Sequence, residues 1–395
     1  NREPEREALV TRPGPLVAAD EGLNHQIADT FARVGESDRS WTEKVWAMAA
    51  ARDGSLSIAF GLGKYPNRNV LDGFAGVSRG TEQWAVRASR RLAPDVDRTE
   101  VGPIAYEIVS ALGTTRYRLD ANDVVPIRFD VEVEGVAPPA VEEREVHLSR
   151  SRLRVDADVI RFHQSGVARG WVEIDGERTE IDDEAWVGAR DRSWGVRYGV
   201  GVPPEDLEPT PLPEGTAGMF VWMPVTMTRP DGRPFTLFVY FQRYSGPGWS
   251  TGSARGSIEL PDGRVKAFQD VIPALEFRDD NRRLTGGTLT VVLADGSERT
   301  YRVEPVSDTG FHLGAGLYGG FEGHYQGEWR GDLHVDGEHV TDCDTPEVAR
   351  RLKQHRDCIV RVTDLTDGST GVGTMQSNVV GAHPEMGLTE DASFA

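Results

Sequence analysis

The Asp-Gly dipeptide recurs along this chain, and most copies lie between two runs of residues that suit β-strands. Such a pair is the strongest local signal for a tight β-hairpin, because glycine readily adopts the positive φ that these turns need. The copies that carry the argument stand at 53–54, 175–176, 231–232, 262–263, 295–296 and 336–337. Repeated hairpins at short spacing predict an antiparallel, all-β chain.

The length of the chain favours two domains, because 395 residues exceed what one typical hydrophobic core holds together. The strand-like runs from Trp41 to Arg197 amount to about eight strands, enough for a small barrel. Residues 202–215 contain five prolines, which cannot donate ladder hydrogen bonds, and this stretch is the expected boundary. The predicted organisation is an extended arm (1–23), a first β-barrel (24–201), a linker (202–215) and a second β-barrel (216–395).

Three local patterns add detail to this arrangement. A short helix is predicted from Pro346 to about His355, with Thr345 as its cap and proline at the first helical position. Residues 24–34 show a weaker helical spacing of apolar side chains. The stretch 61–67 is predicted to end its strand as a loop, and 328–335 is predicted to be a strand ending at the Asp-Gly pair 336–337.

Composition excludes several classes of partner. A formal net charge of −19 argues against nucleic acid and anionic membrane surfaces, and its ordinary consequence is solubility. No apolar run approaches the length of a membrane span. Cys343 and Cys358 lack zinc-ligand spacing and suit a reducing compartment. The charged start of the chain does not resemble a signal peptide, so a cytoplasmic location is expected.

Residues 186–197, WVGARDRSWGVR, form the most distinctive stretch and are predicted to be the last strand of the first half. Alternation along a strand gives two sets of side chains: Asp191, Ser193 and Arg197 on one face, and Arg190, Arg192 and Trp194 on the other. Two interpretations of Asp191 are open. It is either the partner of a neighbouring arginine at a strand end, or a carboxyl group held inside a barrel as a proton donor.

Common catalytic signatures are absent, including the phosphate loop, the dinucleotide fingerprint, G-x-S-x-G and H-E-x-x-H. Segments 63–67, 161–164 and 314–329 mix aromatic with polar residues, a pattern that suits either core packing or the wall of a pocket. The histidines between 324 and 339 lie among acidic residues. Alternating histidine and acid is more typical of a solvated strand face than of a metal site, so no metal is expected.

The stretches 161–177 (RFHQSGVARGWVEIDGE) and 188–197 (GARDRSWGVR) resemble an actinobacterial group of proteins that is distantly related to the hydroxyneurosporene synthase (carotenoid hydratase) superfamily. Residues 63–70 (GKYPNRNV) and the glycine- and aromatic-rich segment 314–331 fit the same group. Better-known relatives carry D-H-x-x-G where this chain reads D-R-S-W-G at 191–195, so the aspartate and glycine are retained and the histidine is not. The resemblance implies two consecutive lipocalin-like barrels with a site between them. It also implies hydration or dehydration of isoprenoid alcohols, or the guidance of cyclisations.

Dehydration of an alcohol, or hydration of an alkene, passes through a carbocation-like state. It needs a carboxylic acid whose pKa is raised by an apolar pocket, and aromatic faces that stabilise the cation by about 2 kcal/mol each when desolvated. Asp191 is the candidate acid, assisted by His163 or Tyr65, and Glu322 is the next candidate if an arginine pairs with Asp191. The candidate substrate-binding residues are Trp46, Trp194, Arg197, Tyr318, Phe321, His324 and Tyr325.

These expectations favour a cofactor-independent hydro-lyase that acts on a hydrophobic, terpenoid-like alcohol or alkene. Two alternatives use the same apolar cavity. A lipocalin-like carrier would bind a hydrophobic small molecule without an acid of shifted pKa, and an isomerase or cyclase would use the cavity as a template. In each case the expected partner is a hydrophobic small molecule.

Overall fold

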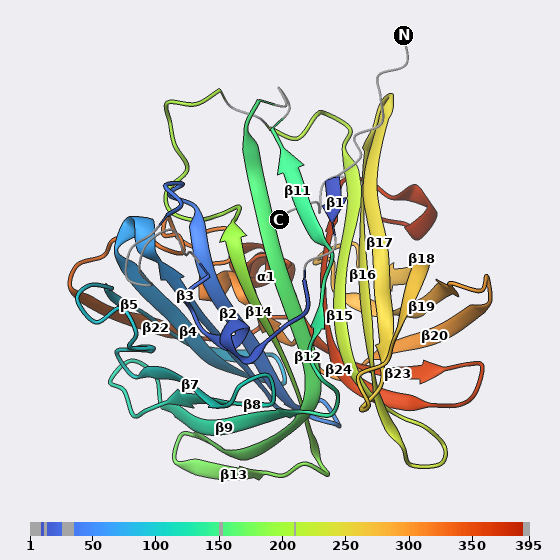
Figure 1. Cartoon of the computed structure of the whole chain (residues 1–395), viewed down its shortest axis with the longest axis horizontal. Coiled ribbons are helices and arrows are strands. Elements are labelled where there is room, and N and C mark those ends of the chain that lie inside the picture. Colours follow the sequence, from blue (N-terminus) through green and yellow to red (C-terminus); the bar gives the residue numbers. More distant parts are fainter. Residues whose placement is uncertain (1–8, 12–13, 26–34, 150–152, 209–210, 390–395) are drawn as a thin grey trace.

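The computed structural model of the chain describes residues 9–11, 14–25, 35–149, 153–208 and 211–389. These residues form two antiparallel sheets with very little helix. Figure 1 shows the first half of the chain, coloured blue to green, beside the second half, coloured yellow to red, with the long strand β12 (Val155–Ile174) between them. The prediction of an all-β chain built from two consecutive lipocalin-like antiparallel barrels is confirmed.

The first sheet follows the order β22-β5-β4-β3-β2-β14-β12-β9-β8-β7-β6. Alternate side chains from these strands pack into one buried apolar cluster, which includes Val45, Phe60 and Phe129. Besides β12, the strands of this sheet are β1 (Leu9–Thr11), β2 (Trp41–Ala51), β3 (Ser57–Tyr65), β4 (Val70–Arg79), β5 (Glu82–Arg91), β6 (Glu100–Val101), β7 (Ile104–Ser110), β8 (Thr114–Leu119), β9 (Ile127–Gly135), β10 (Ala140–Val141), β11 (Arg144–Leu148), β13 (Glu177–Ile181), β14 (Trp186–Val196) and β22 (Leu333–Val340).

The second sheet closes on itself, because β20 pairs with β23 from Tyr301↔Asp364 to Pro305↔Val360. A second apolar cluster, with Val225 and Leu289 at 0 % exposure, fills this barrel. Its strands, with the short β21 beside β23, are β15 (Ala217–Thr228), β16 (Pro234–Gly246), β17 (Trp249–Glu259), β18 (Val265–Phe277), β19 (Leu284–Leu293), β20 (Glu298–Pro305), β21 (Phe311–His312), β23 (Arg356–Asp364) and β24 (Thr370–Val380).

The helix predicted in the second half is present as α1 (Pro346–Leu352) and is shorter than expected. The Thr345 side chain accepts a hydrogen bond from the backbone N–H of Val348 at 3.4 Å, as a helix cap does. The helix ends because Lys353 adopts φ 69°. The single-turn helices are η1 (Ala18–Glu21), η2 (Pro66–Arg68), η3 (Leu313–Gly316) and η4 (Pro384–Met386). The helical spacing predicted over 24–34 falls mostly on 26–34, outside the described residues.

Five of the six Asp-Gly pairs occupy turns between antiparallel strands, and the sixth does not. Asp336 and Gly337 lie inside β22, where they pair with Arg87 and Val86 of β5. The predicted strand 328–335 is therefore wrong at both ends, because the chain returns here to add a strand to the first sheet. A Cβ atom on Gly337 would lie 2.2 Å from the carbonyl oxygen of Ala85, so this glycine permits close strand packing.

The loop predicted over 61–67 is also wrong, because β3 continues to Tyr65 with every residue buried. Gly61 stands where a Cβ atom would lie 2.2 Å from the Phe74 ring of β4. Its role is to admit an aromatic side chain across the sheet, and the chain turns only at η2.

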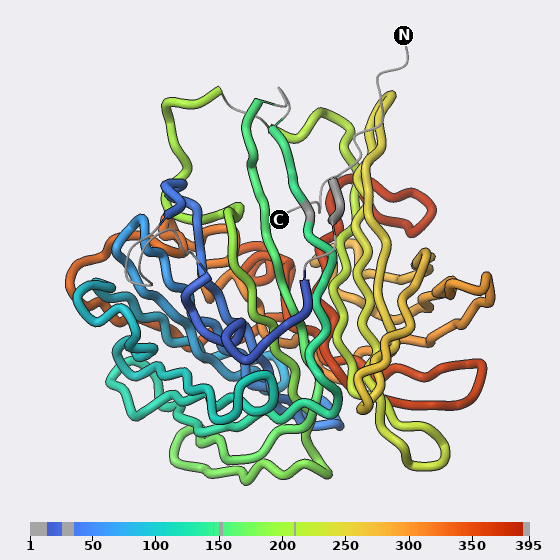
Figure 2. The backbone as a smooth tube through the Cα atoms, in the orientation of Figure 1, coloured from blue at the N-terminus to red at the C-terminus, as the bar shows by residue number. Residues whose placement is uncertain are grey.

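A third apolar cluster lies outside the two barrel cores and joins residues from both halves. Trp46 of β2 and Ala189 of β14 meet Trp222 of β15 and Phe238 of β16 in this cluster. Figure 2 traces how the later, orange part of the chain returns to lie among the blue strands of the first half, where β22 pairs with β5. Among the described residues, no helix is long and apolar enough to cross a membrane.

Candidate site between the barrels

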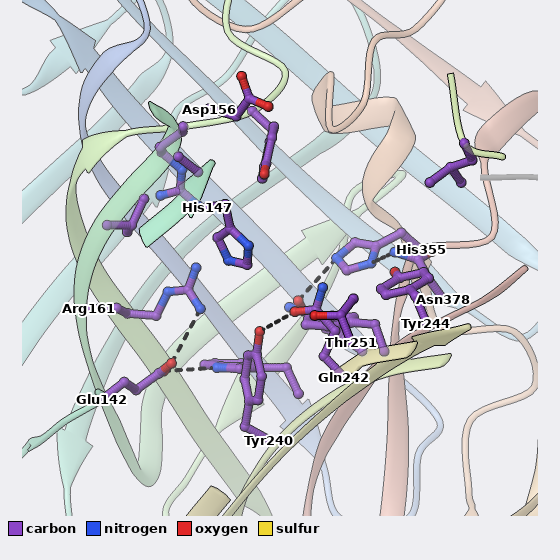
Figure 3. Close-up of a pocket in the computed structure, with 18 of the residues that line it drawn as sticks. Glu142, His147, Asp156, Arg161, Tyr240, Gln242, Tyr244, Thr251, His355 and Asn378 are labelled. Carbon is purple, nitrogen blue, oxygen red and sulfur yellow. Dashed lines mark hydrogen bonds and ion pairs between the residues drawn. The ribbon is translucent and has the colours of Figure 1, made fainter. Parts of the chain in front are cut away.

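A cavity of about 1230 Å³ lies between the two barrels, and both contribute to its walls. The first half supplies residues of β2, β11, β12 and β14, and the second half supplies residues of β15, β16, β17 and β24. On these strands the cavity is lined by side chains that face away from their own barrel core. Figure 3 shows Arg161 and Glu142 on one side of the cavity and His355 and Asn378 on the opposite side.

Asp191 of β14 points into this cavity, and its side chain is 14 % exposed. Antiparallel register places it opposite His163 of β12, and Arg161 lies two residues before His163 on the same face. Arg161 Nε is 3.3 Å from Asp191 Oδ2, but this N–H has no hydrogen-bond acceptor among the described residues. Among the described residues, the Asp191 carboxyl accepts no hydrogen bond, so its contact with Arg161 is purely electrostatic.

Burial raises the pKa of the Asp191 carboxyl above its usual range, because removal from water disfavours the ionised form. The guanidinium groups of Arg161 and Arg197 act in the opposite direction, and Glu142 adds to the upward shift. The net effect is upward. The side chain therefore combines access to the cavity with a pKa above that of an ordinary aspartate.

Glu142 also lines the cavity, but its environment holds it as an anion. Its carboxylate accepts a hydrogen bond from Trp222 Nε1 at 3.0 Å, lies 3.3 Å from His163 Nδ1 and is 3.5 Å from Arg161 Nη1. Burial alone would raise the pKa of Glu142, but Arg161 and His163 bring it down to about 2. Glu142 is thus a fixed charge at the cavity wall and cannot act as an acid at neutral pH.

His163 lies behind Glu142, between that residue and Glu259 of β17, whose Oε1 is 2.7 Å from His163 Nε2. The ring stacks on Phe238 at 3.6 Å. Burial would lower the pKa of His163, but the two carboxylates raise it to about 9. His163 is therefore a charged link between the two barrels.

On the opposite side of the cavity, hydrogen bonds link four side chains in a row: Asn378, His355, Gln376 and Asp357. Asn378 Nδ2 lies 2.9 Å from His355 Nδ1, and His355 Nε2 lies 3.2 Å from Gln376 Oε1. Gln376 Nε2 in turn donates to Asp357 Oδ1 at 2.8 Å. Burial lowers the pKa of His355 to about 4 and raises the pKa of Asp357 to about 7. This side of the cavity carries a neutral imidazole and, behind it, a buried carboxyl group.

Aromatic rings cover much of the remaining wall. Trp46 and Trp222 meet edge to face with their ring centroids 5.1 Å apart, and Phe220 meets Tyr240 at 5.8 Å. Tyr318 adds a further ring, with Lys44 Nζ 3.7 Å from its centroid. Faces of this kind accept apolar ligand surface and attract cationic centres.

The structure brings four of the residues predicted from the sequence to the cavity: Asp191, Trp46, Arg197 and Tyr318. His163 contacts the cavity only through Glu142. Tyr65 is buried near Gly63 and Gly327, outside the cavity lining. Trp194 lies on the opposite face of β14 and stacks on His25 at 3.5 Å.

The remaining predicted site residues lie away from the cavity. Glu322 forms an ion pair with Arg351 at 2.6 Å, and Phe321 is buried beneath the same arginine. His324 pairs with a nearby glutamate, and Tyr325 packs close to the backbone of Gly320. Among the described residues, no group of three side chains is arranged to hold a metal ion.

Sequence reasoning missed several residues that line the cavity, among them Lys44, Glu142, Trp222 and His355, and it singled out Arg161 only as part of segment 161–164, without a role. One signal was available: Arg161 and His163 are two residues apart and so share a strand face. The others lie in ordinary strand or loop sequence, and only the packing of the two barrels brings them together.

Fold and site together define a class: an all-β protein of two lipocalin-like barrels with a ligand-sized cavity between them. The chain belongs to a family of unknown function, DUF8625, which matches residues 16–389. No curated protein matches it.

Several solved structures resemble this chain in fold. An AttH protein from Nitrosomonas europaea is 12 % identical, with 85 % of this chain and 91 % of that chain covered and a TM-score of 0.49. Kievitone hydratase from Nectria haematococca is 10 % identical, with coverage of 85 % and 88 % and a TM-score of 0.42. CghA with Sch210972 is 13 % identical, with coverage of 86 % and 88 % and a TM-score of 0.47.

Proposed function

We propose that this protein is a cofactor-independent hydro-lyase that dehydrates a hydrophobic alcohol, or hydrates the corresponding alkene, in the cavity between the barrels. One observation carries the proposal. Asp191 presents to an aromatic cavity a carboxyl group whose pKa is raised by burial, and no hydrogen bond from the described residues holds it in its ionised form.

In the dehydration direction, protonated Asp191 gives its proton to the hydroxyl oxygen of the substrate. The C–O bond breaks, water leaves, and the positive charge is left on carbon. The faces of Trp46, Trp222 and Tyr318 stabilise that charge. The Asp191 carboxylate then takes a proton from the neighbouring carbon, which forms the alkene and restores the acid. The reverse sequence adds water, and neither direction consumes an oxidant or a reductant.

The test uses purified protein and a panel of terpenoid alcohols, with mass spectrometry to detect loss of one water. Asp191→Asn should lower turnover by about 10²- to 10⁴-fold, the usual contribution of general acid catalysis, and leave the melting temperature close to that of the wild type. Asp156→Asn is the matched control, because Asp156 also lines the cavity but pairs with Arg154. Equal turnover in Asp191→Asn and the wild type would rule out Asp191 as the acid.

A second candidate function is that of a binding protein for a hydrophobic small molecule. It is favoured by the contact between Arg161 and Asp191, because an arginine beside a carboxylate is also a common structural arrangement. Binding of panel members with no product from any of them would support this candidate. An isomerase or cyclase would instead give products with the mass of the substrate.

A further inference from the structure

Two cations in the cavity have no carboxylate partner among the described residues: Lys44 of β2 and Arg197, which follows β14. Lys44 is 4 % exposed, and its Nζ donates to Gln326 Oε1 at 2.5 Å. Arg197 Nη1 donates to Ser193 Oγ at 2.6 Å. Both hydrogen bonds go to neutral acceptors, and neither cation is within ion-pair distance of a described carboxylate. Asp72 and Asp191 still act on the charge of Lys44, and Asp191 acts on that of Arg197, but without direct contact.

Two carboxylates of the cavity wall are already engaged by a third cation. Arg161 lies 3.5 Å from Glu142 and 3.3 Å from Asp191. Glu142 is further occupied by Trp222 and His163. The cavity wall around Asp191 therefore carries three cations, Lys44, Arg161 and Arg197, and two carboxylates, both of which already face Arg161.

Burial and neighbouring like charges act together on the pKa values of these groups. Burial and the nearby Arg197 hold the pKa of Lys44 well below its usual range, and burial and Arg161 lower the pKa of Arg197. Three mutually repelling cations at one end of a partly desolvated cavity cost free energy in the unliganded protein. An anion bound among them would offset that cost.

We propose that the ligand of this cavity is an amphipathic anion, with an apolar body against Trp46 and Trp222 and a carboxylate-like group between Lys44 and Arg197. The inference rests on the proposed function only in assigning the ligand to the same cavity. It also gives the two cations a role in that function. A ligand anion would neutralise charges that otherwise favour ionised Asp191, so binding would promote the protonated form that the dehydration needs.

The test compares two probes that share an apolar body and differ in charge: 1-anilinonaphthalene-8-sulfonate, an anion, and N-phenyl-1-naphthylamine, its neutral counterpart. Fluorescence titration of the full chain should give a dissociation constant at least about tenfold lower for the anion. Arg197→Gln and Lys44→Met should each weaken binding of the anion by about tenfold and change binding of the neutral probe by less than about twofold. Arg264→Gln is the matched control, because Arg264 is an exposed arginine paired with Asp262 in a hairpin turn.

Equal affinity of the wild type for the two probes would overturn the proposal. So would an Arg197→Gln variant that folds, as judged by its melting temperature, and binds the anion as tightly as the wild type. If Lys44→Met does not fold, Arg197→Gln alone decides. Asp191→Asn separates this inference from the proposed function, because it should lower turnover by about 10²- to 10⁴-fold without weakening binding of the anion.

Discussion

Arg161 Nε lies 3.3 Å from Asp191 Oδ2 without forming a hydrogen bond to it. The register of β12 and β14 produces this contact by pairing His163 with Asp191 and placing Arg161 two residues away on the same face. The protonation of Asp191 is consequently a balance between burial, which raises its pKa, and Arg161 and Arg197, which lower it. The contact with an arginine that the first interpretation expected is present, and the role of Asp191 as a proton donor stays a prediction.

Arg161→Gln tests that balance. Removing the cation that most lowers the pKa of Asp191 should raise this pKa further, by about one pH unit or more, as expected for an opposite charge at this distance. A ¹³C NMR titration of aspartate carboxyl groups measures the change, and the Asp191→Asn spectrum assigns the resonance. Arg154→Gln, which removes a cation paired with Asp156, should leave the titration of Asp191 as it was. An unchanged or lower pKa in Arg161→Gln would contradict the electrostatic account.

The link between the barrels through His163 gives a pH-dependent prediction. The pKa of His163 is raised to about 9, so its stabilising charge is fully present below its unfolded pKa of about 6.5 and is lost as pH rises through 9. The pKa values of Glu142 and Glu259, which face it, are lowered, so their contribution is lost only at acid pH. His163→Gln should lower the free energy of unfolding by about 3 kcal/mol at pH 6, because it leaves buried Glu259 without its cation and Glu142 with Arg161 alone.

The difference between His163→Gln and the wild type should shrink as pH rises from about 6.5 to about 9, because over this range the folded wild type holds a proton that the unfolded chain has lost. Urea unfolding at several pH values measures it. His339→Gln is the control, because His339 pairs with Glu82 at an exposed position. A difference that stays constant across this pH range would show that His163 acts by packing on Phe238 and not by charge.

Much of the fold could be predicted because its signals are local. An Asp-Gly turn between two strand-like runs specifies a hairpin without reference to the rest of the chain. The prediction failed at Asp336-Gly337, where the same dipeptide lies within a strand that pairs with β5. That pairing joins residues about 250 positions apart in the sequence, and no local pattern reports it.

Strand alternation gave the most specific prediction of the candidate site. Asp191 and Arg197 were expected to share a face, and both line the cavity. Tyr65 and Trp194 show the limit of such reasoning, because an aromatic side chain suits a core and a pocket wall equally well. His355 and Trp222 could not be placed beforehand, since they reach the cavity only through the packing of one barrel on the other.

That packing depends on a glycine. A Cβ atom on Gly76 of β4 would lie 2.2 Å from the ring of Phe311 and 2.5 Å from the carbonyl oxygen of Trp84. Gly76→Ala should therefore lower the free energy of unfolding by about 2 kcal/mol through overpacking. Gly14→Ala is the control, because a Cβ atom there meets nothing within 4 Å. Thermal unfolding measures the melting temperatures of the two variants. Equal values would mean that Phe311 moves aside at little cost.

The buried carboxyl of Asp357 gives the last prediction. Burial raises its pKa to about 7, whereas an aspartate in the unfolded chain titrates near about 3.9. The folded state thus binds a proton that the unfolded state releases, so wild-type stability should fall as pH rises from about 4 to about 7. Asp357→Asn, neutral at every pH, should lack this decline. This variant carries a constant cost of about 1 kcal/mol for disturbing the hydrogen bond from Trp46, so the slope of unfolding free energy against pH is the diagnostic quantity.

Asp295→Asn is the control, because hydrogen bonds from Ser297 lower the pKa of exposed Asp295 and confine its effect to acid pH. Urea unfolding across this range measures both slopes, and a wild-type decline that persists in Asp357→Asn would assign it to another group.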